Sequence, residues 1–526
     1  MLKHLLSILA ILTLALVSCG QSKIALSSNN VKDTHLDKKY ANYIISKPID
    51  LKGGTLSFAK GTTIIFKGKG SISNGTIIGD ETLLKRPQVH DVHFEGRFLN
   101  TDITLSDLFD GETDFWGMVQ SFPKARIILD KNISLPDSKT GTISVSRFHL
   151  EGKGHTVTVR RCPVLKNADI CITNAIIDCR IASERVIYGI AEDLNAKYIV
   201  KNCKFINVPE TNTLCSRAYH DVNIEGCEIN GILTDDSKST VKNIMQIRTH
   251  SCTGTVVVKK NIIKNCYGAA IAGTYFNPDD NTHVQFANNI IDHVSGGGII
   301  FVSGAVRNAT VCGNTIRRTH TLGKQFEGEI DGGPNSAINF HGFYNALVEN
   351  NIIENCPNSS CFDFDGSLKG KKYIAKGSGL TVRGNKVLNS GPAAIYVVEQ
   401  VDFIGNKIEG NVFYGNSDAA VFVMGARNVT ISGNEMKYSS KTSKTIHPIY
   451  VKDHNDVSSG KLLIENNNIS STGDSFIYVH KNYTGECQTD NNIVLSSKKI
   501  DGTLEVINKS NTKVKVPATG RIILKQ

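Results

Sequence analysis

The chain of 526 residues lacks any Cys-x-x-Cys pair and any cysteine and histidine spacing of the kind that holds zinc. We therefore expect no metal site from its 13 cysteines, several of which occupy repeated small-residue positions suited to a buried core. Lysine and arginine are dispersed, and no basic helix or aromatic-basic platform is present. Because the positive charge is dispersed, we expect no nucleic-acid partner. The net charge of +10 is compatible with an anionic glycan.

The sequence also lacks a transmembrane-length apolar run at its start. The run from Leu5 to Val17 is too short to cross a bilayer and is typical of a signal peptide. The segment Leu16-Val17-Ser18-Cys19 resembles the bacterial lipobox. The resemblance implies a lipoprotein signal peptide over residues 1–18 and a lipid on Cys19. The exported protein would then lie at the bacterial cell envelope, on the periplasmic face or the cell surface, and touch the membrane only through its anchor.

What the sequence does contain is a repeat. A small or polar residue, preceded in most repeats by Gly or Asn and followed two positions later by an apolar residue, recurs every 21 to 37 residues. Its positions are Cys203, Cys227, Asn261, Asn289, Asn314, Asn351, Asn385, Asn406, Asn434, Asn467 and Asn491. A period in the low twenties with insertions predicts a parallel β-solenoid, and stacked asparagines can hydrogen-bond from coil to coil. Because parallel crossovers are right-handed, we expect an all-β fold, a right-handed parallel β-helix.

The repeat also suggests how the chain is organised. Residues 19–42 are polar and predict a tether, and residues 43–143 predict a β-rich region with a short helix near Asp110–Val119 that caps the first coil. We place the β-helix at residues 144–496 and a C-terminal β cap at 497–526. The length exceeds that of a single compact core, but solenoids grow without this limit. We expect a monomer.

Each coil carries a second strand after the repeated position. Because side chains alternate across a strand, apolar residues would point into the coil while polar and aromatic residues form an outer face. Insertions on both sides of this strand predict a trench that binds a ligand. The expected outer positions are Gln246/Arg248, Asn339/His341, Asp363/Asp365, Tyr396/Val398, Phe422/Met424, Tyr450/Lys452 and Tyr478/His480.

The centre of this face is rich in carboxylates. Asp363 and Asp365 lie two apart on one strand, with Cα atoms about 6.7 Å apart, and His341 and Asn339 lie one coil below. Glu329 and Asp331, in the preceding insertion, enter the same coil. Crowded carboxylates have raised pKa values, as general-acid catalysis requires. We expect no cofactor, and a calcium ion held by these carboxylates is the alternative use of the cluster.

This arrangement resembles the right-handed parallel β-helix, pectate-lyase-like glycoside hydrolases and polysaccharide lyases of bacteria. In several such glycosidases an acidic, glycine-rich segment precedes one coil and an aspartate pair lies on the next. Glu329/Asp331-Gly-Gly and Asp363-Phe-Asp365-Gly stand in those places. The polygalacturonase motifs are absent from the sequence, so that family is not assigned. The resemblance implies a glycoside hydrolase acting on an oligo- or polysaccharide through paired carboxylates, with Asp363, Asp365, Glu329, Asp331 and His341 as catalytic candidates.

Two other functions remain open. A polysaccharide lyase acting on uronic acids would need a base, for which Tyr450, Lys452, Tyr478 and His480 are candidates, with Arg248 and His250 on an earlier coil. A non-catalytic glycan-binding or tailspike-like adhesin would use the aromatic ladder that Tyr396, Phe422, Tyr450 and Tyr478 are expected to form. The substrate-binding candidates are Arg248, His250, Asn339, Tyr396, Glu399, Phe422, Tyr450, Lys452, Tyr478 and His480.

Overall fold

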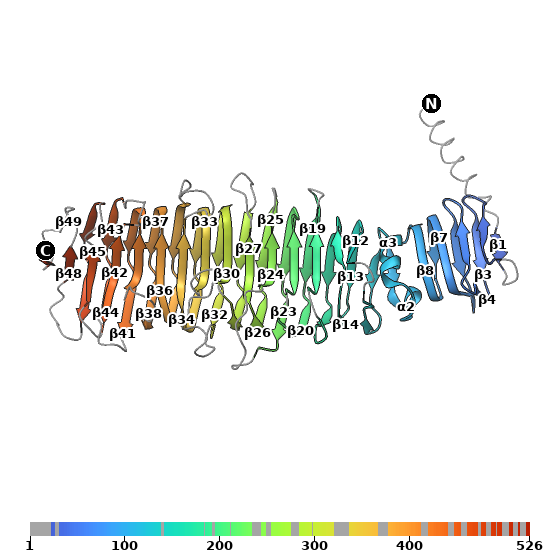
Figure 1. The fold of residues 1–526 in the computed structure, drawn as a ribbon, viewed down its shortest axis with the longest axis horizontal. Coiled ribbons are helices and arrows are strands. Elements are labelled where there is room, and N and C mark those ends of the chain that lie inside the picture. Colours follow the sequence, from blue (N-terminus) through green and yellow to red (C-terminus); the bar gives the residue numbers. More distant parts are fainter. Residues whose placement is uncertain are drawn as a thin grey trace, which may run out of the picture. The chain divides into compact units, whose positions relative to one another are not determined.

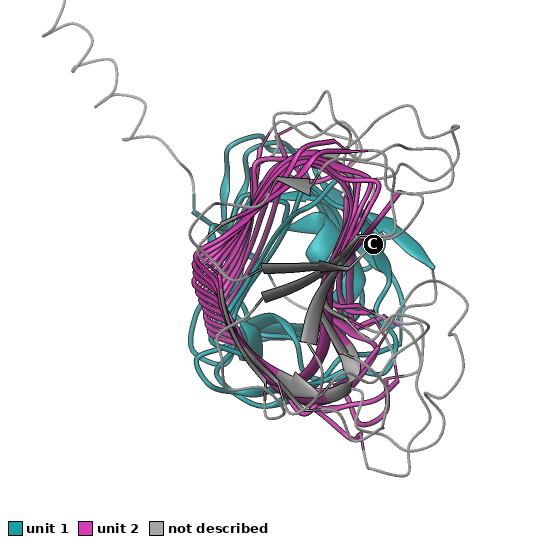
Figure 2. Ribbon diagram, turned by 90° about the vertical axis from the view of Figure 1, so that its left-hand side faces the viewer, with its two compact units in different colours: residues 1–176 teal, residues 177–526 magenta. Residues whose placement is uncertain are grey.

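The chain divides into two compact units, residues 1–176 and 177–526 (Figure 2). The computed structural model describes residues 23–26, 31–137, 141–182, 185–191, 195–210, 212–233, 243–248, 254–274, 283–296, 298–319, 336–366, 377–411, 419–439, 446–453, 460–471, 475–479, 485–490, 492–496, 504–508, 514–515 and 522–525. Within these residues, neither short helix has the length or hydropathy needed to span a membrane.

The first unit consists mostly of short parallel strands (Figure 1). They are β1 (Lys23–Leu26), β2 (Thr34–Leu36), β3 (Asn42–Ile45), β4 (Pro48–Asp50), β5 (Thr55–Phe58), β6 (Thr63–Phe66), β7 (Ser71–Lys85), β8 (Val89–Phe98), β9 (Asp102–Thr104), β10 (Arg126–Ile128), β11 (Ile133–Ser134), β12 (Thr142–Ser144), β13 (Arg147–Glu151), β14 (Thr156–Thr158), β15 (Val164–Lys166) and β16 (Asp169–Thr173). β17 (Ile176–Asp178) falls at the division between the units.

Strand pairing begins earlier than the sequence suggests. β1 pairs in parallel with β3, and β2 with β5, so residues expected in a tether over 19–42 include strands. Further along, β9, β10 and β13 pair in parallel, with Ile103 opposite Ile127 and Ile127 opposite Leu150. These three side chains are buried. Stacked aliphatic residues therefore build parallel coils upstream of Ser144, where we expected the β-helix to start.

The expected helix is present as α3 (Phe115–Ser121), preceded by the short α2 (Leu105–Leu108). The Asp114 side chain caps α3, because its Oδ1 accepts a hydrogen bond from the Gly117 backbone N at 3.1 Å. Phe122 follows the helix and stacks on Phe98 of β8, with ring centroids 4.6 Å apart. The helix thus joins the apolar core of its own unit.

The second unit repeats three strands per coil, and strands of successive coils pair in parallel. The first sheet contains β18 (Ile187–Ile190), β21 (Leu214–Arg217), β24 (Asn243–Arg248), β27 (Ala269–Thr274), β30 (Gly298–Arg307), β33 (Ser336–Glu349), β34 (Ile352–Asp365), β36 (Lys386–Tyr396), β39 (Ala419–Met424), β42 (Ile446–Lys452), β45 (Ser475–Val479), β48 (Leu504–Asn508) and β50 (Ile522–Lys525).

The second sheet contains β19 (Lys197–Lys201), β22 (Asp221–Glu225), β25 (Thr255–Lys259), β28 (His283–Ala287), β31 (Ala309–Cys312), β35 (Gly377–Arg383), β37 (Val398–Ile404), β40 (Arg427–Ser432), β43 (Leu462–Glu465), β46 (Cys487–Asp490) and β49 (Val514–Lys515). The third contains β20 (Lys204–Val208), β23 (Glu228–Gly231), β26 (Ile262–Tyr267), β29 (Ile290–Ser295), β32 (Thr315–Arg317), β38 (Lys407–Asn411), β41 (Glu435–Ser439), β44 (Asn468–Ser471) and β47 (Ile493–Ser496). The long strands β33, β34 and β36 turn a corner and belong to two sheets each.

These coils form the expected right-handed parallel β-helix. Viewed from its end, the strands of the unit superimpose from coil to coil (Figure 2). Alternate aliphatic and aromatic side chains point inward, and Ile338, Phe340, Phe362 and Phe364 are fully buried. The parallel pairing continues through β45, β48 and β50 into the region expected to be a C-terminal cap.

The asparagine ladder lies inside this helix, between the second and third sheets. Each ladder asparagine donates from its backbone N and from its Nδ2 to the Oδ1 of the next, at 2.8–3.1 Å. Its Nδ2 also donates to a backbone carbonyl of a neighbouring coil, as from Asn351 to Val311 at 2.9 Å. The ladder is confirmed except at its end, where Asn492 rather than Asn491 accepts from Asn467.

The backbone conformation of the residue before each ladder position explains why this residue is usually Gly or Asn. Gly313, Gly384 and Gly433 have φ values of 63°, 62° and 64°, and Asn288 and Asn350 have 55° and 54°. This left-handed conformation is accessible to glycine and tolerated by asparagine. The dipeptide therefore encodes a tight corner followed by an inward-pointing amide.

Candidate functional site

The first sheet presents two outward columns of side chains. Column one runs, in register from strand to strand, through Tyr188, Cys215, Gln246, Ala272, Phe301, Asn339, Asp363, Ala394, Phe422 and Tyr450. Column two lies two residues further along each strand and includes Arg217, Arg248, Ser303, His341, Asp365, Tyr396, Met424 and Lys452. The parallel register thus brings residues far apart in sequence onto one face.

The predicted centre of the face is assembled as expected. Asn339 lies opposite Asp363, and His341 lies opposite Asp365, on the adjacent strands β33 and β34. Asn339 Nδ2 donates to Asp363 Oδ2 at 3.0 Å, and His341 Nε2 lies 4.0 Å from the same oxygen, an ion-pair distance. Tyr396 follows in register with Asp365 on β36. We name Asn339, His341, Asp363, Asp365 and Tyr396 the acidic cluster.

The two carboxyl groups of the cluster have different environments. Asp363 is 2% exposed although its strand position faces outward, whereas Asp365 is partly exposed. Burial raises the pKa of Asp363; His341 acts against the rise, the charge of Asp365 adds to it, and the Asn339 hydrogen bond opposes it. Asn339 is itself 3% exposed, and its Oδ1 has no hydrogen-bond partner among the described residues. The cluster therefore holds one enclosed acid and one unsatisfied amide oxygen.

Tyr396 lies in column two, in register with Asp365 and Met424, and not in column one as predicted. We expected Tyr396 and Val398 as outward neighbours, but β36 ends at Tyr396, and Val397 has a left-handed φ of 51°. The chain turns there, so Val398 is buried at the start of β37. Ala394 takes the place in column one that the aromatic ladder assigned to Tyr396. The hydroxyl of Tyr396 is instead a neighbour of the carboxylates: burial, then the charges of Asp363 and Asp365, raise its pKa.

The aromatic side of the face is shorter than predicted. Phe422 and Tyr450 share column one and stack with centroids 5.2 Å apart, and the Tyr396 ring reaches Phe422 from column two at 5.7 Å. Lys452 Nζ lies 5.3 Å from the centre of the Phe422 ring. The backbone of Tyr478 lies opposite Tyr450 in register, and the Tyr478 side chain lies outside the described part of the structure. The platform is thus a cluster of rings beside the acidic cluster, interrupted at Ala394.

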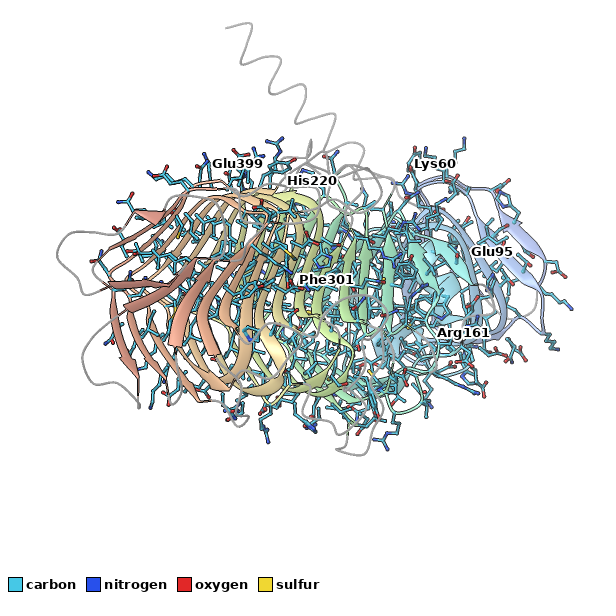
Figure 3. All side chains as sticks on the ribbon, turned by 60° about the vertical axis from the view of Figure 1, so that its left-hand side comes forward. Lys60, Glu95, Arg161, His220, Phe301 and Glu399 are labelled. Carbon is cyan, nitrogen blue, oxygen red and sulfur yellow. The ribbon has the colours of Figure 1, made fainter. Side chains whose placement is uncertain are left out.

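The remaining candidates are dispersed. Glu399 lies on β37 in the second sheet, opposite Arg427, and not on the face of Phe301, as the separate labels in Figure 3 show. Arg248 is on the face, four coils from Asp365. Glu329, Asp331, His250, His480 and the lipidation candidate Cys19 lie outside the described residues, and their roles remain predictions.

Metal and thiol chemistry can be addressed for the described part of the chain. There, no three His, Cys, Asp or Glu side chains gather closely enough to hold a metal ion. The calcium alternative also involves Glu329 and Asp331, which the structure does not describe. The 11 cysteines within the described ranges are free thiols. Cys227 occupies a ladder position, where its backbone N donates to Asn261 Oδ1 at 2.9 Å.

Several residues of the face were not predicted. Phe301 packs edge-on against the His341 ring with centroids 5.5 Å apart. Tyr188, Cys215 and Arg217 extend the columns toward the start of the unit. The segment Leu214-Cys-Ser-Arg217 shares with Met245-Gln-Ile-Arg248 an apolar first residue and a final arginine, and this shared arginine is the signal that could have placed Arg217.

The comparison with protein families agrees with the fold. Residues 336–516 match the family model described as right handed beta helix region. No curated protein matches the chain. Among solved structures, the A-module of the mannuronan C-5 epimerase AlgE6 from Azotobacter vinelandii is 9% identical, with 96% of this chain and 93% of that chain covered and a TM-score of 0.20. A similarity of that size supports no conclusion about function.

Proposed function

We propose that this protein is a carbohydrate-active enzyme, a glycoside hydrolase that cleaves an oligo- or polysaccharide lying across the first sheet. The observation that carries the proposal is the pair Asp363 and Asp365, two carboxyl groups on one strand in different environments. Pairs of titratable groups in contrasting environments are typical of acid and base catalysts. The neighbouring rings of Phe422 and Tyr450 offer faces on which sugar rings can stack.

The two aspartates fit different steps of hydrolysis. Asp363 fits the general acid, because burial favours its protonated form. It would donate its proton to the glycosidic oxygen as the bond from that oxygen to the anomeric carbon breaks. Asp365, the more exposed of the two, would take a proton from the water whose oxygen attacks that carbon. Their Cα atoms lie about 6.7 Å apart on one strand, at the lower edge of the separation of about 6.5–9.5 Å between the two carboxyl groups of inverting enzymes.

Other members of the cluster would position these groups. Asn339 holds Asp363 Oδ2 through its amide, and His341 stands beside the same oxygen. Tyr396, held in its protonated form by burial and the two carboxylates, can donate a hydrogen bond to substrate or carboxylate. Glu329 and Asp331 stay candidates for a further carboxylate.

The lyase alternative needs a base close to the carboxylates. Lys452 is three coils from Asp365, about 14 Å away, and the raised pKa of Tyr396 disfavours a tyrosinate. His341 is the base that stands beside the pair. A lyase would therefore depend on His341 rather than on Lys452.

One assay separates these functions. Purified protein is incubated with bacterial, plant and host glycans, and reducing ends and the ultraviolet absorbance of unsaturated sugars are followed together. We expect reducing ends without absorbance, lost in Asp365→Asn and retained in Lys452→Ala. Absorbance that persists in Asp365→Asn and disappears in His341→Ala would assign a lyase, and tight binding without product would assign a glycan-binding protein.

A further inference from the structure

Three arginines gather at the start of the second unit, on the face that carries the acidic cluster. Arg217 on β21 lies directly opposite Arg248 on β24 in column two. The Arg185 guanidinium lies 4.3 Å from the centre of the Tyr188 ring, and Tyr188 is opposite Cys215 in column one. Burial raises the pKa of Cys215 to about 11, and Arg185, Arg248 and Arg217 all act against that rise. The three positive charges therefore converge on one place.

Charged side chains elsewhere in the unit pair with carboxylates of an adjacent coil: Lys407 Nζ lies 3.0 Å from Glu435, and Arg383 lies 2.8 Å from Glu349. Lys407 also lies opposite Lys386, but Glu435 neutralises its charge. Like charges directly opposite one another destabilise a sheet. Arg185 and Arg217 are exposed, and neither forms an ion pair with a carboxylate of the described residues. An anion bound by the Arg185 and Arg217 guanidinium groups would neutralise their charge.

The neighbouring side chains suit a sugar that carries such an anion. Gln246 lies opposite Cys215 and is 8% exposed, and it offers an amide that can donate to and accept from hydroxyl groups. The Tyr188 ring, under the Arg185 guanidinium, supplies an aromatic edge. Arginine binds carboxylate and sulfate groups with two parallel hydrogen bonds. The site therefore combines charge recognition with sugar recognition.

We propose that Arg185, Arg217 and Arg248 form a subsite for an acidic sugar residue, a uronate carboxylate or a sulfate ester, of the polysaccharide that reaches the acidic cluster. This inference rests on the proposed function, because it assumes that the same chain crosses both places. Arg248 is four coils from Asp365, about 19 Å at about 4.8 Å per coil. A chain spanning that distance contains several sugar residues, so the substrate is an anionic polymer and the subsite recognises it away from the bond that breaks.

The test measures binding of the full chain to defined polymers. Polygalacturonate and alginate serve as uronate probes, a sulfated galactan as the sulfate probe, and a mixed-linkage β-glucan as the neutral probe, by affinity electrophoresis and calorimetry. We expect one anionic probe to bind at least tenfold more tightly than the neutral one. The double variant Arg217→Gln/Arg248→Gln should weaken that binding about tenfold or more, because each charge-assisted contact is worth that much. Preference for uronate or for sulfate identifies the anion.

A matched control removes the same charge from another sheet. Lys407→Gln/Lys437→Gln loses two positive charges from exposed ion pairs on the third sheet and should change binding less than twofold. Equal losses in the two double variants, tighter binding of the neutral glucan, or tighter arginine-dependent binding of duplex DNA than of any polysaccharide would overturn the subsite.

Failure of the subsite can be told apart from failure of the proposed hydrolysis. Asp365→Asn should abolish product formation while leaving the arginine-dependent binding of the anionic polymer intact. Arginine-dependent binding without any cleavage by wild-type protein would support the subsite and reject the hydrolase. Cleavage of a neutral glycan that is unchanged in the arginine variant would reject the subsite and keep the hydrolase. Oligosaccharides too short to span four coils should be insensitive to Arg217→Gln/Arg248→Gln.

Discussion

The ladder inside the β-helix and the acidic cluster on its first sheet both stack polar side chains at the same coil spacing, yet their hydrogen bonding differs. Asn351 in the ladder donates to Asn385 and Val311, and its Oδ1 accepts two hydrogen bonds from Asn314. Among the described residues, the Asn339 side chain makes one hydrogen bond, to Asp363, and its buried Oδ1 has no partner. The buried amide of Asn351 thus has hydrogen-bond partners for both its oxygen and its nitrogen, whereas the Asn339 amide oxygen has none among the described residues.

The difference indicates what each stack does. Satisfied buried amides stabilise a fold, whereas an enclosed carboxyl group and an orphaned amide oxygen lower stability unless a ligand binds them. The acidic cluster keeps these groups at a cost in stability, which is typical of sites that bind or react. Replacements in the ladder should therefore reduce stability, and replacements in the cluster should reduce function while leaving the fold intact.

The largest effect is expected from Asn351→Ala. The substitution leaves the Val311 carbonyl and two donors of Asn314 without partners in the core, and should lower the free energy of unfolding by about 3–5 kcal/mol. Urea denaturation followed by circular dichroism measures it. The control is Asn468→Ala, at an exposed position of β44, which should cost under about 0.5 kcal/mol. Equal losses in the two variants would show that the ladder is not a special source of stability.

A smaller effect is expected on the aromatic side of the face. Tyr450→Ala removes the ring stacked on Phe422 and should weaken glycan binding about tenfold, a loss of about 1.4 kcal/mol, with little change in stability because the side chain is partly exposed. Tyr344→Ala is the matched control: Tyr344 lies beyond the corner of β33 and contacts Arg307. If both variants bind alike, the ligand does not lie on the first sheet.

The smallest effect concerns pH. The pKa of Asp363 is raised in the folded state, so the folded chain holds this proton at pH values where the unfolded chain has released it. The stabilisation is full below the unfolded pKa of about 3.9 and is lost as pH rises through the folded pKa. Unfolding free energies measured from pH 4 to 8 should fall more steeply for wild type than for Asp363→Asn over that range. Parallel profiles would contradict the raised pKa.

The sequence predicted the ladder and the pairing of Asn339 with Asp363, because a period of one residue type and strict alternation depend only on local geometry. The sequence misplaced Tyr396, because residues 393–398 form an apolar run that looks like one continuous strand. Only the left-handed φ of Val397 shows that the strand ends at Tyr396. The last ladder position was assigned to Asn491, but Asn492 occupies it. The two asparagines are adjacent, so the sequence pattern cannot tell which one points inward. The burial of Asp363 was also beyond prediction, since alternation gives the direction of a side chain and not what covers it.

The most direct test of the contrast between the two stacks is to measure stability and product formation together in Asp363→Asn. An amide at this position removes the buried acid and can pair with Asn339 as the ladder amides pair with one another. The account predicts that the variant is more stable than wild type at pH 7, by about 1–3 kcal/mol, and forms product at least about 100-fold more slowly from the glycan that wild type cleaves. A variant that is less stable than wild type and still active would contradict it.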